Sequence, residues 1–119
     1  MTSIRTKRIY DPATPDDGCR ILIDRLWPRG LKKQEAAIDH WAKSIAPSTE
    51  LRQWLHADPG RWPDFPARYR DELRLREDEL RQLLERGGDG PLTLLYSAKD
   101  RDHNHALVLK EVLEELQRR

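Results

Sequence analysis

Two short apolar runs stand out along the chain and predict buried strands. Ile21-Leu22-Ile23 shows no alternation of polar and apolar positions, and Leu92-Thr93-Leu94-Leu95-Tyr96 places apolar residues on both faces. This pattern is typical of strands in a parallel sheet flanked by helices, and the first of the two is expected to be central. The segment from Ser3 to Tyr10 alternates imperfectly among Arg and Lys residues, which predicts a further strand partly open to solvent.

Apolar residues at helical spacing predict three helices. Ser48 is expected to cap the first, which buries Leu51, Trp54 and Leu55. A long helix capped by Asp64 is predicted to continue to Glu85. The last helix is expected to begin near Asp102 or Asn104 and to bury an apolar face made of Ala106, Leu109, Val112, Leu113 and Leu116. The segment 31–42 fits either a helix or a short extended segment, and both alternatives stay open.

The order of these elements predicts the fold class. Strand, loop, strand, helices, strand and helix fit a compact three-layer α/β/α domain, helix-rich, with a small and mostly parallel sheet. With 119 residues, the chain is expected to form a single domain, residues 1–119, around one core.

Charge is almost balanced along this sequence. The 22 Lys and Arg residues oppose 21 Asp and Glu residues, so the net charge is +1 although charged residues make up 36% of the chain. The long-range field is weak and gives no reason to expect nucleic acid or an anionic membrane as partner. Cys19 is the only cysteine, and neither a secretory signal nor an apolar run of about 18 residues occurs. We therefore expect a cytoplasmic protein.

The chain's tryptophans suggest an alternative function. Trp27, Trp41, Trp54 and Trp62 stand near Arg or Lys residues, as do the stacking platforms of single-strand-binding proteins. Tryptophans at helical spacing in a small domain are mainly core residues, however, and the balanced charge lacks the usual electrostatic footprint. A nucleic-acid or protein interaction module without catalytic activity, using Trp62, Arg61 and Arg68, therefore stays as the less favoured hypothesis.

Polar residues follow both apolar runs. Asp24 and Arg25 come after the first, and Ser97 to Asp102 comes after the second. If the two strands run parallel, both loops emerge at the carboxyl edge of the sheet, where ligands bind in open α/β folds. The second loop leads into the amino end of the last helix, which attracts anions, and Arg25, Arg29 and Lys99 could bind one. We therefore expect a pocket for a small anionic, phosphate-bearing ligand. The alternative is that Asp24 pairs with a nearby cation only to satisfy the strand end.

Proton-transfer chemistry at this edge would use Asp24, Asp100 or His105. His103 and His105 are two residues apart and cannot share a helical face, so no metal site is expected. Neither a Gly-x-Ser-x-Gly elbow nor a Gly-x-x-x-x-Gly-Lys phosphate loop occurs, and no cofactor is expected.

Four sequence blocks carry a resemblance to a known family. They are Asp24-Arg25-Leu26-Trp27-Pro28-Arg29-Gly30, Trp41-Ala42-Lys43-Ser44-Ile45-Ala46-Pro47-Ser48, Leu51-Arg52, and Thr93-Leu94-Leu95-Tyr96-Ser97-Ala98-Lys99-Asp100 with Asn104-His105-Ala106. The chain resembles the YeaO-like branch of the bacterial domain-of-unknown-function family 488. The resemblance implies a compact α/β fold in a small bacterial cytosolic protein and carries over no activity.

The family's motif extends the list of candidate site residues. The positions expected to bind the ligand are Arg25, Trp27, Arg29, Gly30, Lys43, Arg52, Ser97, Lys99 and Asn104, and the candidate catalytic residues are Asp24, Asp100 and His105. More distant relatives tend to carry a cysteine in the loop after the last strand, where this chain has Tyr96-Ser97-Ala98. That departure argues against a thiol mechanism of rhodanese or phosphatase type.

Overall fold

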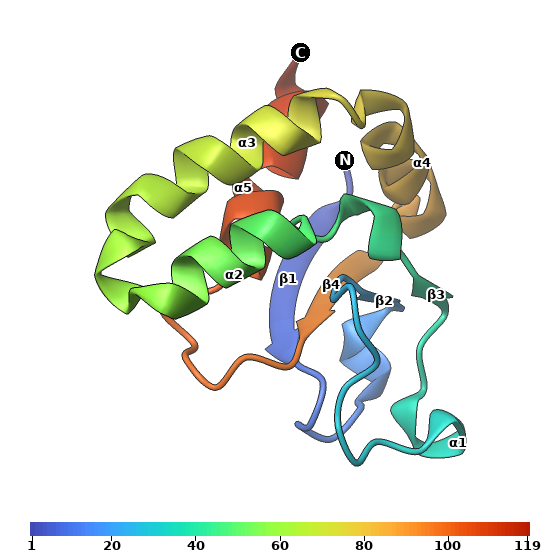
Figure 1. Cartoon of the computed structure of the whole chain (residues 1–119). Coiled ribbons are helices and arrows are strands. Elements are labelled where there is room, and N and C mark those ends of the chain that lie inside the picture. The colour runs from blue at the N-terminus through green and yellow to red at the C-terminus, as the bar shows by residue number, and fades with distance from the viewer.

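Four parallel strands form one sheet in the order β1-β4-β2-β3 (Figure 1). The computed structural model describes residues 1–119, and its strands are β1 Ser3–Arg8, β2 Cys19–Leu22, β3 His40–Trp41 and β4 Pro91–Tyr96. β2 and β4, the two predicted apolar strands, lie side by side, with Ile21 opposite Leu94 and Leu22 opposite Leu95. Their parallel pairing brings their carboxyl ends to the same edge of the sheet.

Both faces of the central strands are covered, which explains their missing polarity pattern. Ile21 and Leu94 face one hydrophobic cluster, whereas Leu22 and Leu95 face another, and all four side chains are fully buried. Each such side chain contributes roughly 1.5–3 kcal/mol relative to remaining exposed. Because successive side chains point to opposite faces of the sheet, a polar residue at any of these four positions would lose this contribution on the face that it covers.

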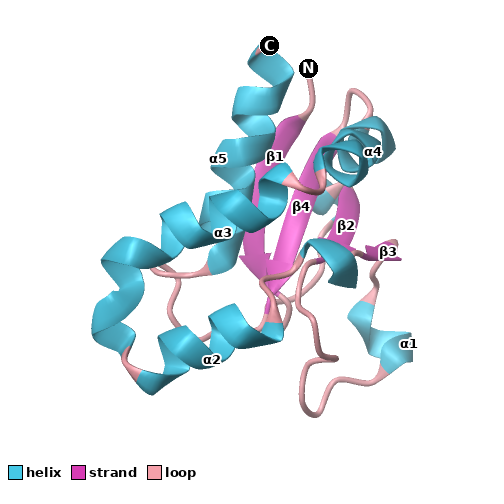
Figure 2. Ribbon diagram, turned by 45° about the horizontal axis from the view of Figure 1, so that its top comes forward, coloured by secondary structure: helices cyan, strands magenta, loops and turns pink.

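The larger cluster is covered by helices. They are α2 Thr49–Ala57, α3 Phe65–Arg74, α4 Glu77–Gly87 and α5 His105–Arg118, and α2 and α3 lie together beside the sheet in Figure 2. The opposite face is covered by a thinner layer: the 3-10 turn Pro15–Asp17, the one-turn helix α1 Lys33–Ala36 and the loops around them. The fold is therefore a compact, helix-rich α/β domain, as predicted. No helix has the length and apolar character that crossing a bilayer requires.

The predicted long helix is two helices. α3 ends at Arg74 and α4 begins at Glu77, with the 84%-exposed Leu75 at the corner between them. The spacing of apolar residues continues through the corner, so the sequence shows no break. Tertiary packing supplies the reason: α3 lies on α5, whereas α4 also covers β4, and one straight helix could not do both.

Three local predictions had different outcomes. Ser48 caps α2 by accepting a hydrogen bond from the N–H of Leu51 at 3.1 Å, as predicted. The predicted cap at Asp64 is wrong, because a 3-10 helix, Pro59–Asp64, runs directly into α3 and Asp64 itself is helical. Segment 31–42 contains both alternatives, the short helix α1 and the short strand β3.

A buried ion cluster holds the thinner layer on the sheet. The carboxylate of Asp17 binds Lys7 and Arg20, and the Arg20 guanidinium also donates to the carbonyls of Ala36 and Ala37. Burial disfavours the charged carboxylate, but the hydrogen bonds from Thr14, Lys7 and Arg20 outweigh it and hold the pKa of Asp17 well below its usual range. The segment between β1 and β2, predicted only as the loop between two strands, therefore contains a structural anchor.

Candidate functional site

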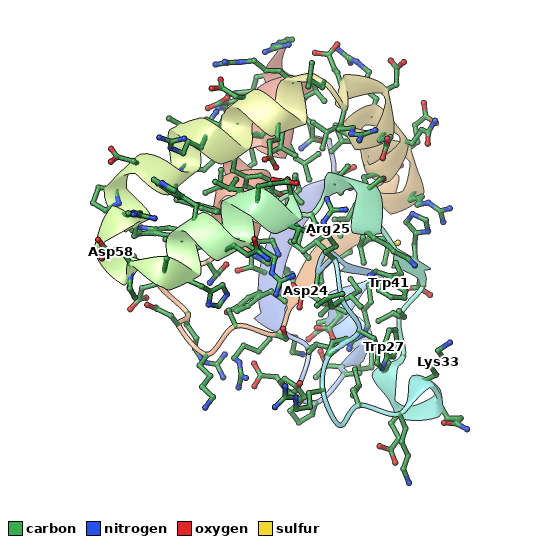
Figure 3. The ribbon with its side chains drawn as sticks, in the orientation of Figure 1. Asp24, Arg25, Trp27, Lys33, Trp41 and Asp58 are labelled. Carbon is green, nitrogen blue, oxygen red and sulfur yellow. The ribbon has the colours of Figure 1, made fainter.

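A cavity of about 630 Å³ opens where β2 and β4 end. Its wall comes from the loop after β2, the inner face of α2, the start of α3 and the loop after β4. Figure 3 shows Asp24 below the end of α2 and Arg25 beside that end. The two loops that the sequence expects to meet do line one cavity.

Asp24 is at the centre of the polar part of the wall. One carboxylate oxygen, Oδ2, accepts from the backbone N–H of Ser97 at 3.0 Å and from its hydroxyl at 2.5 Å. The other, Oδ1, lies 3.1 Å from Nε2 of His105. Asp24 therefore ties the end of β2 to the end of β4 and to the first residue of α5.

The contacts of His105 define its tautomer. Nε2 faces two acceptors, Oδ1 of Asp24 at 3.1 Å and the carbonyl oxygen of Ile23 at 3.0 Å. Only a nitrogen carrying hydrogen satisfies two acceptors, so Nε2–H is assigned as the donor. In the neutral ring, Nδ1 then carries the lone pair.

The electrostatics of this group keep Asp24 ionised. Burial raises the pKa of its carboxyl, but the hydrogen bonds and charge interaction with His105 and the hydrogen bonds from Ser97 prevail, so the pKa lies below its usual value. A carboxylate with a lowered pKa is a weak general base near neutral pH. Moreover, the Ser97 hydroxyl donates to Asp24 and not to His105, so the three residues do not form a Ser-His-Asp relay.

The candidate arginines have different surroundings. Arg25 donates to the carbonyl oxygens of Ala46 and Pro47, both at 3.0 Å, and so holds the segment before α2. Arg29 and Arg52 also line the cavity, but neither guanidinium has an ion-pair partner. Arg25 has no ion pair either, but its guanidinium is bound to backbone carbonyls, whereas those of Arg29 and Arg52 make no hydrogen bond and are free to bind a ligand.

Asp100 and Asn104 organise the loop after β4. Asp100 accepts from the backbone N–H groups of Asp102 and His103, which lowers the pKa of its carboxyl. Asn104 caps α5 by accepting from the N–H of Leu107, and its amide donates to the carbonyls of Asp100 and Arg101. Both residues line the cavity, and their observed contacts are structural.

Four further candidates are distributed inside and outside the cavity. Trp27 lines it, with its indole N–H bound to the carbonyl of Leu31 at 2.7 Å. Lys43 lies outside it, 4.2 Å above the ring of Trp41. Gly30 is outside as well and has φ of +76°, which a turn at this position requires. Lys99 is exposed and does not contribute to the wall, although Ser97 does.

Several lining residues were missed by sequence reasoning. Arg52 was named, but Leu55 and His56, which share its face of α2 at spacings of three and four, were not assigned to the site. Trp62 and Phe65 form an aromatic part of the wall and stack with ring centroids 5.1 Å apart. Helical spacing could have identified the α2 residues, whereas only tertiary structure brings Trp62 and Phe65 to this edge. No group of three or more His, Cys, Asp or Glu side chains is arranged to hold a metal ion.

Comparison with known proteins identifies the family. Residues 3–119 match the family DUF488-N3i, described as "Inactive DUF488-N3 subclade". The chain belongs to this family. The resemblance inferred from the four sequence blocks is therefore confirmed, and the match to the family covers nearly the whole chain.

Individual relatives agree with this assignment. The chain is 50% identical over 114 residues to "Uncharacterized protein YeaO" of Escherichia coli (strain K12), covering 96% of this chain and 99% of that protein. It is 40% identical over 114 residues to "Uncharacterized protein Rv3073c" of Mycobacterium tuberculosis (strain ATCC 25618 / H37Rv), covering 94% of each. No solved structure matches the chain.

Proposed function

We propose that this DUF488-N3i chain binds a small anionic, phosphate-bearing ligand in the cavity at the carboxyl edge of its sheet, and that it does not turn the ligand over. The observation that carries the proposal is the pair of guanidiniums, Arg29 and Arg52, that line the cavity and make neither an ion pair nor a hydrogen bond, whereas Arg25 is bound to backbone carbonyls. A guanidinium binds phosphate through two parallel hydrogen bonds and stays charged at any physiological pH.

The surroundings of the cavity also favour an anion. The first turn of α5 begins at His105, beside Asp24 and Ser97, and its unpaired N–H groups and positive dipole end attract negative charge. The carboxylate of Asp24 opposes an anion, but its charge is offset by donors from Ser97 and His105. Asp100 is likewise bound to backbone N–H groups.

Binding without turnover is supported by two independent observations. The family carries the word "Inactive" in its description. The side chains available for chemistry are committed to holding the strand ends: Asp24 has a lowered pKa, and the Ser97 hydroxyl donates to it. No group in this arrangement activates Ser97 as a nucleophile.

Thermal unfolding in the presence of anions tests the proposal. Phosphate, pyrophosphate, ribose 5-phosphate and nucleoside phosphates are added separately to the unmutated chain and to Arg29→Ala and Arg52→Ala. At least one phosphate compound is expected to raise Tm, because a ligand that binds only the folded state stabilises it. Both arginine variants should lose most of that rise.

Lys99→Ala and Arg74→Ala are the matched controls. Lys99 is exposed and outside the cavity wall, and Arg74 pairs with Asp71 on the exposed face of α3. Both control variants are expected to respond to the ligand as the unmutated chain does. If no anion raises Tm, or if Arg52→Ala keeps the full response, the proposal fails.

The alternative of a nucleic-acid module is less well supported. The ring of Trp54 already has two cation–π partners, Arg61 at 5.3 Å and Arg68 at 4.4 Å from its centroid, and a base would have to displace at least one of them to stack on it. Trp62, another of the candidate platforms, lines the cavity at the sheet edge and not an extended groove that could follow a strand. Fluorescence anisotropy with single-stranded DNA at increasing salt tests this alternative, since a real interaction weakens with a slope set by the phosphates contacted.

A further inference from the structure

We infer that the ligand of this cavity is a nucleoside phosphate, whose flat base lies on the aromatic wall around Trp62 while its phosphate is held by Arg29 and Arg52. This inference rests on the proposed function and adds the chemical class of the ligand. It is based on the aromatic and apolar part of the cavity wall, which phosphate binding alone does not need.

The size of the cavity suits a whole organic ligand. At about 630 Å³ it could hold roughly twenty water molecules at about 30 Å³ each, far more than an inorganic phosphate occupies. The volume falls among those of pockets that enclose whole organic ligands. A site for a bare anion would need only the arginines.

The aromatic part of the wall suits a planar base. Trp62 lines the cavity and is stacked on Phe65 with an interplanar angle of 16°. Phe65 is 2% exposed and belongs to the core, so the indole is backed by a rigid residue. His103, another lining residue, has its ring 5.3 Å from that of Trp62. A planar base that enters the cavity therefore meets two aromatic side chains and can stack with little ordering cost.

Polar and apolar groups alternate along α2 in a way that suits a ligand with two different ends. Arg52, Leu55 and His56 line the cavity from one face of this helix, so positive charge and apolar surface are about one turn apart. Leu55 and the neighbouring Pro59 continue the apolar surface toward Trp62. A ligand with an anionic end and a flat apolar end matches this wall, whereas a sugar phosphate matches only its charged half.

Calorimetric titration of matched fragments tests the inference. The ligands are the four ribonucleoside 5′-monophosphates, adenosine, and ribose 5-phosphate, each added to the unmutated chain. If the base stacks, the best monophosphate is expected to bind at least roughly fivefold more tightly than ribose 5-phosphate, since base stacking on an aromatic residue contributes at least that much. Adenosine, which lacks the phosphate, should also bind at least roughly tenfold more weakly than adenosine monophosphate.

Variants of Trp62 localise the base. Trp62→Leu removes the ring and should reduce monophosphate affinity to that of ribose 5-phosphate, while ribose 5-phosphate affinity changes by less than about twofold. Trp62→Phe keeps a ring and should retain most of the monophosphate affinity. Trp54→Leu is the control, because Trp54 lies on α2 but outside the cavity. Circular dichroism establishes whether each variant is folded. If Trp62→Leu does not fold, the comparison of the monophosphates with ribose 5-phosphate on the unmutated chain decides whether the base is bound.

The outcomes separate this inference from the proposal beneath it. If ribose 5-phosphate binds as tightly as every monophosphate and Trp62→Leu changes neither affinity, the nucleoside class is wrong while anion binding stands. If adenosine binds as tightly as its monophosphate, the arginines have no role and the proposed function fails. If none of the compounds binds, both fail.

Discussion

Replacing Asp24 by Asn tests whether this carboxylate holds the strand ends together. Three donors converge on it: the backbone N–H and the hydroxyl of Ser97, and Nε2–H of His105. Asn keeps one acceptor oxygen and puts an NH₂ group in place of the other. In either orientation of the amide, at least one donor therefore faces another donor.

The size of the effect follows from the burial of the group. The Asp24 side chain is only 11% exposed, so water does not fully replace a lost hydrogen bond. An unsatisfied buried donor costs about 1–3 kcal/mol, and we expect Asp24→Asn to lower the free energy of unfolding by about 2 kcal/mol. For a chain of this length, that loss corresponds to a decrease in Tm of roughly 8 °C.

The pH dependence of this effect has a defined sign. Burial raises the pKa of Asp24, but the bonds to His105 and Ser97 prevail and lower it below that of the unfolded chain. A lowered folded-state pKa contributes stability that is fully present above the unfolded value of about 4 and is lost as pH falls through the folded value. Asn does not titrate, so the difference in Tm between the two proteins should be steady from neutral pH down to about pH 5 and should shrink below about pH 4.

Thermal unfolding followed by circular dichroism between about pH 3 and about pH 7 measures both effects. Asp102→Asn is the control, because Asp102 is exposed in the loop after β4 and its carboxylate makes no ion pair or hydrogen bond. If Asp24→Asn is as stable as the unmutated chain at neutral pH, or if the difference in Tm is independent of pH, the reasoning is wrong.

Two other substitutions test the anchor on the opposite face of the sheet. Asp17→Asn leaves the buried Arg20 without its counter-ion and should lower the free energy of unfolding in urea by about 3–5 kcal/mol. The same change in an Arg20→Met background should lower it by less. Equal losses in the two backgrounds would contradict the pairing. Gly18→Ala places a Cβ 2.2 Å from the carbonyl oxygen of Pro91 at a φ of +63°, so it should destabilise the chain by more than about 2 kcal/mol. Gly90→Ala, whose Cβ would meet its nearest atom at 3.7 Å, should change stability by less than about 1 kcal/mol, and similar losses at both glycines would argue against the close contact.

The location of the candidate site could be predicted because it depends on strand direction alone. Two apolar runs without alternation indicate parallel neighbours, and the residues after parallel strands meet at one edge. Asp24 and Ser97, 73 positions apart, are hydrogen-bonded as a result. The roles of individual arginines could not be predicted in this way. Arg25 and Arg29 are close in sequence, yet only Arg25 binds backbone carbonyls, and that depends on where the segment before α2 passes.

The sequence by itself determined the features that depend on neighbouring residues: the apolar strands, the cap at Ser48, and the loops that follow the two strands and flank the cavity. Each follows from backbone periodicity or from a side chain that binds its own segment. Only the tertiary structure decided the break between α3 and α4, the formation of the short strand β3, and the pairing of Asp17 with Arg20. It also brought Trp62 to the cavity wall. These features depend on which segment packs against which, and packing energies between distant segments leave no local pattern in the chain.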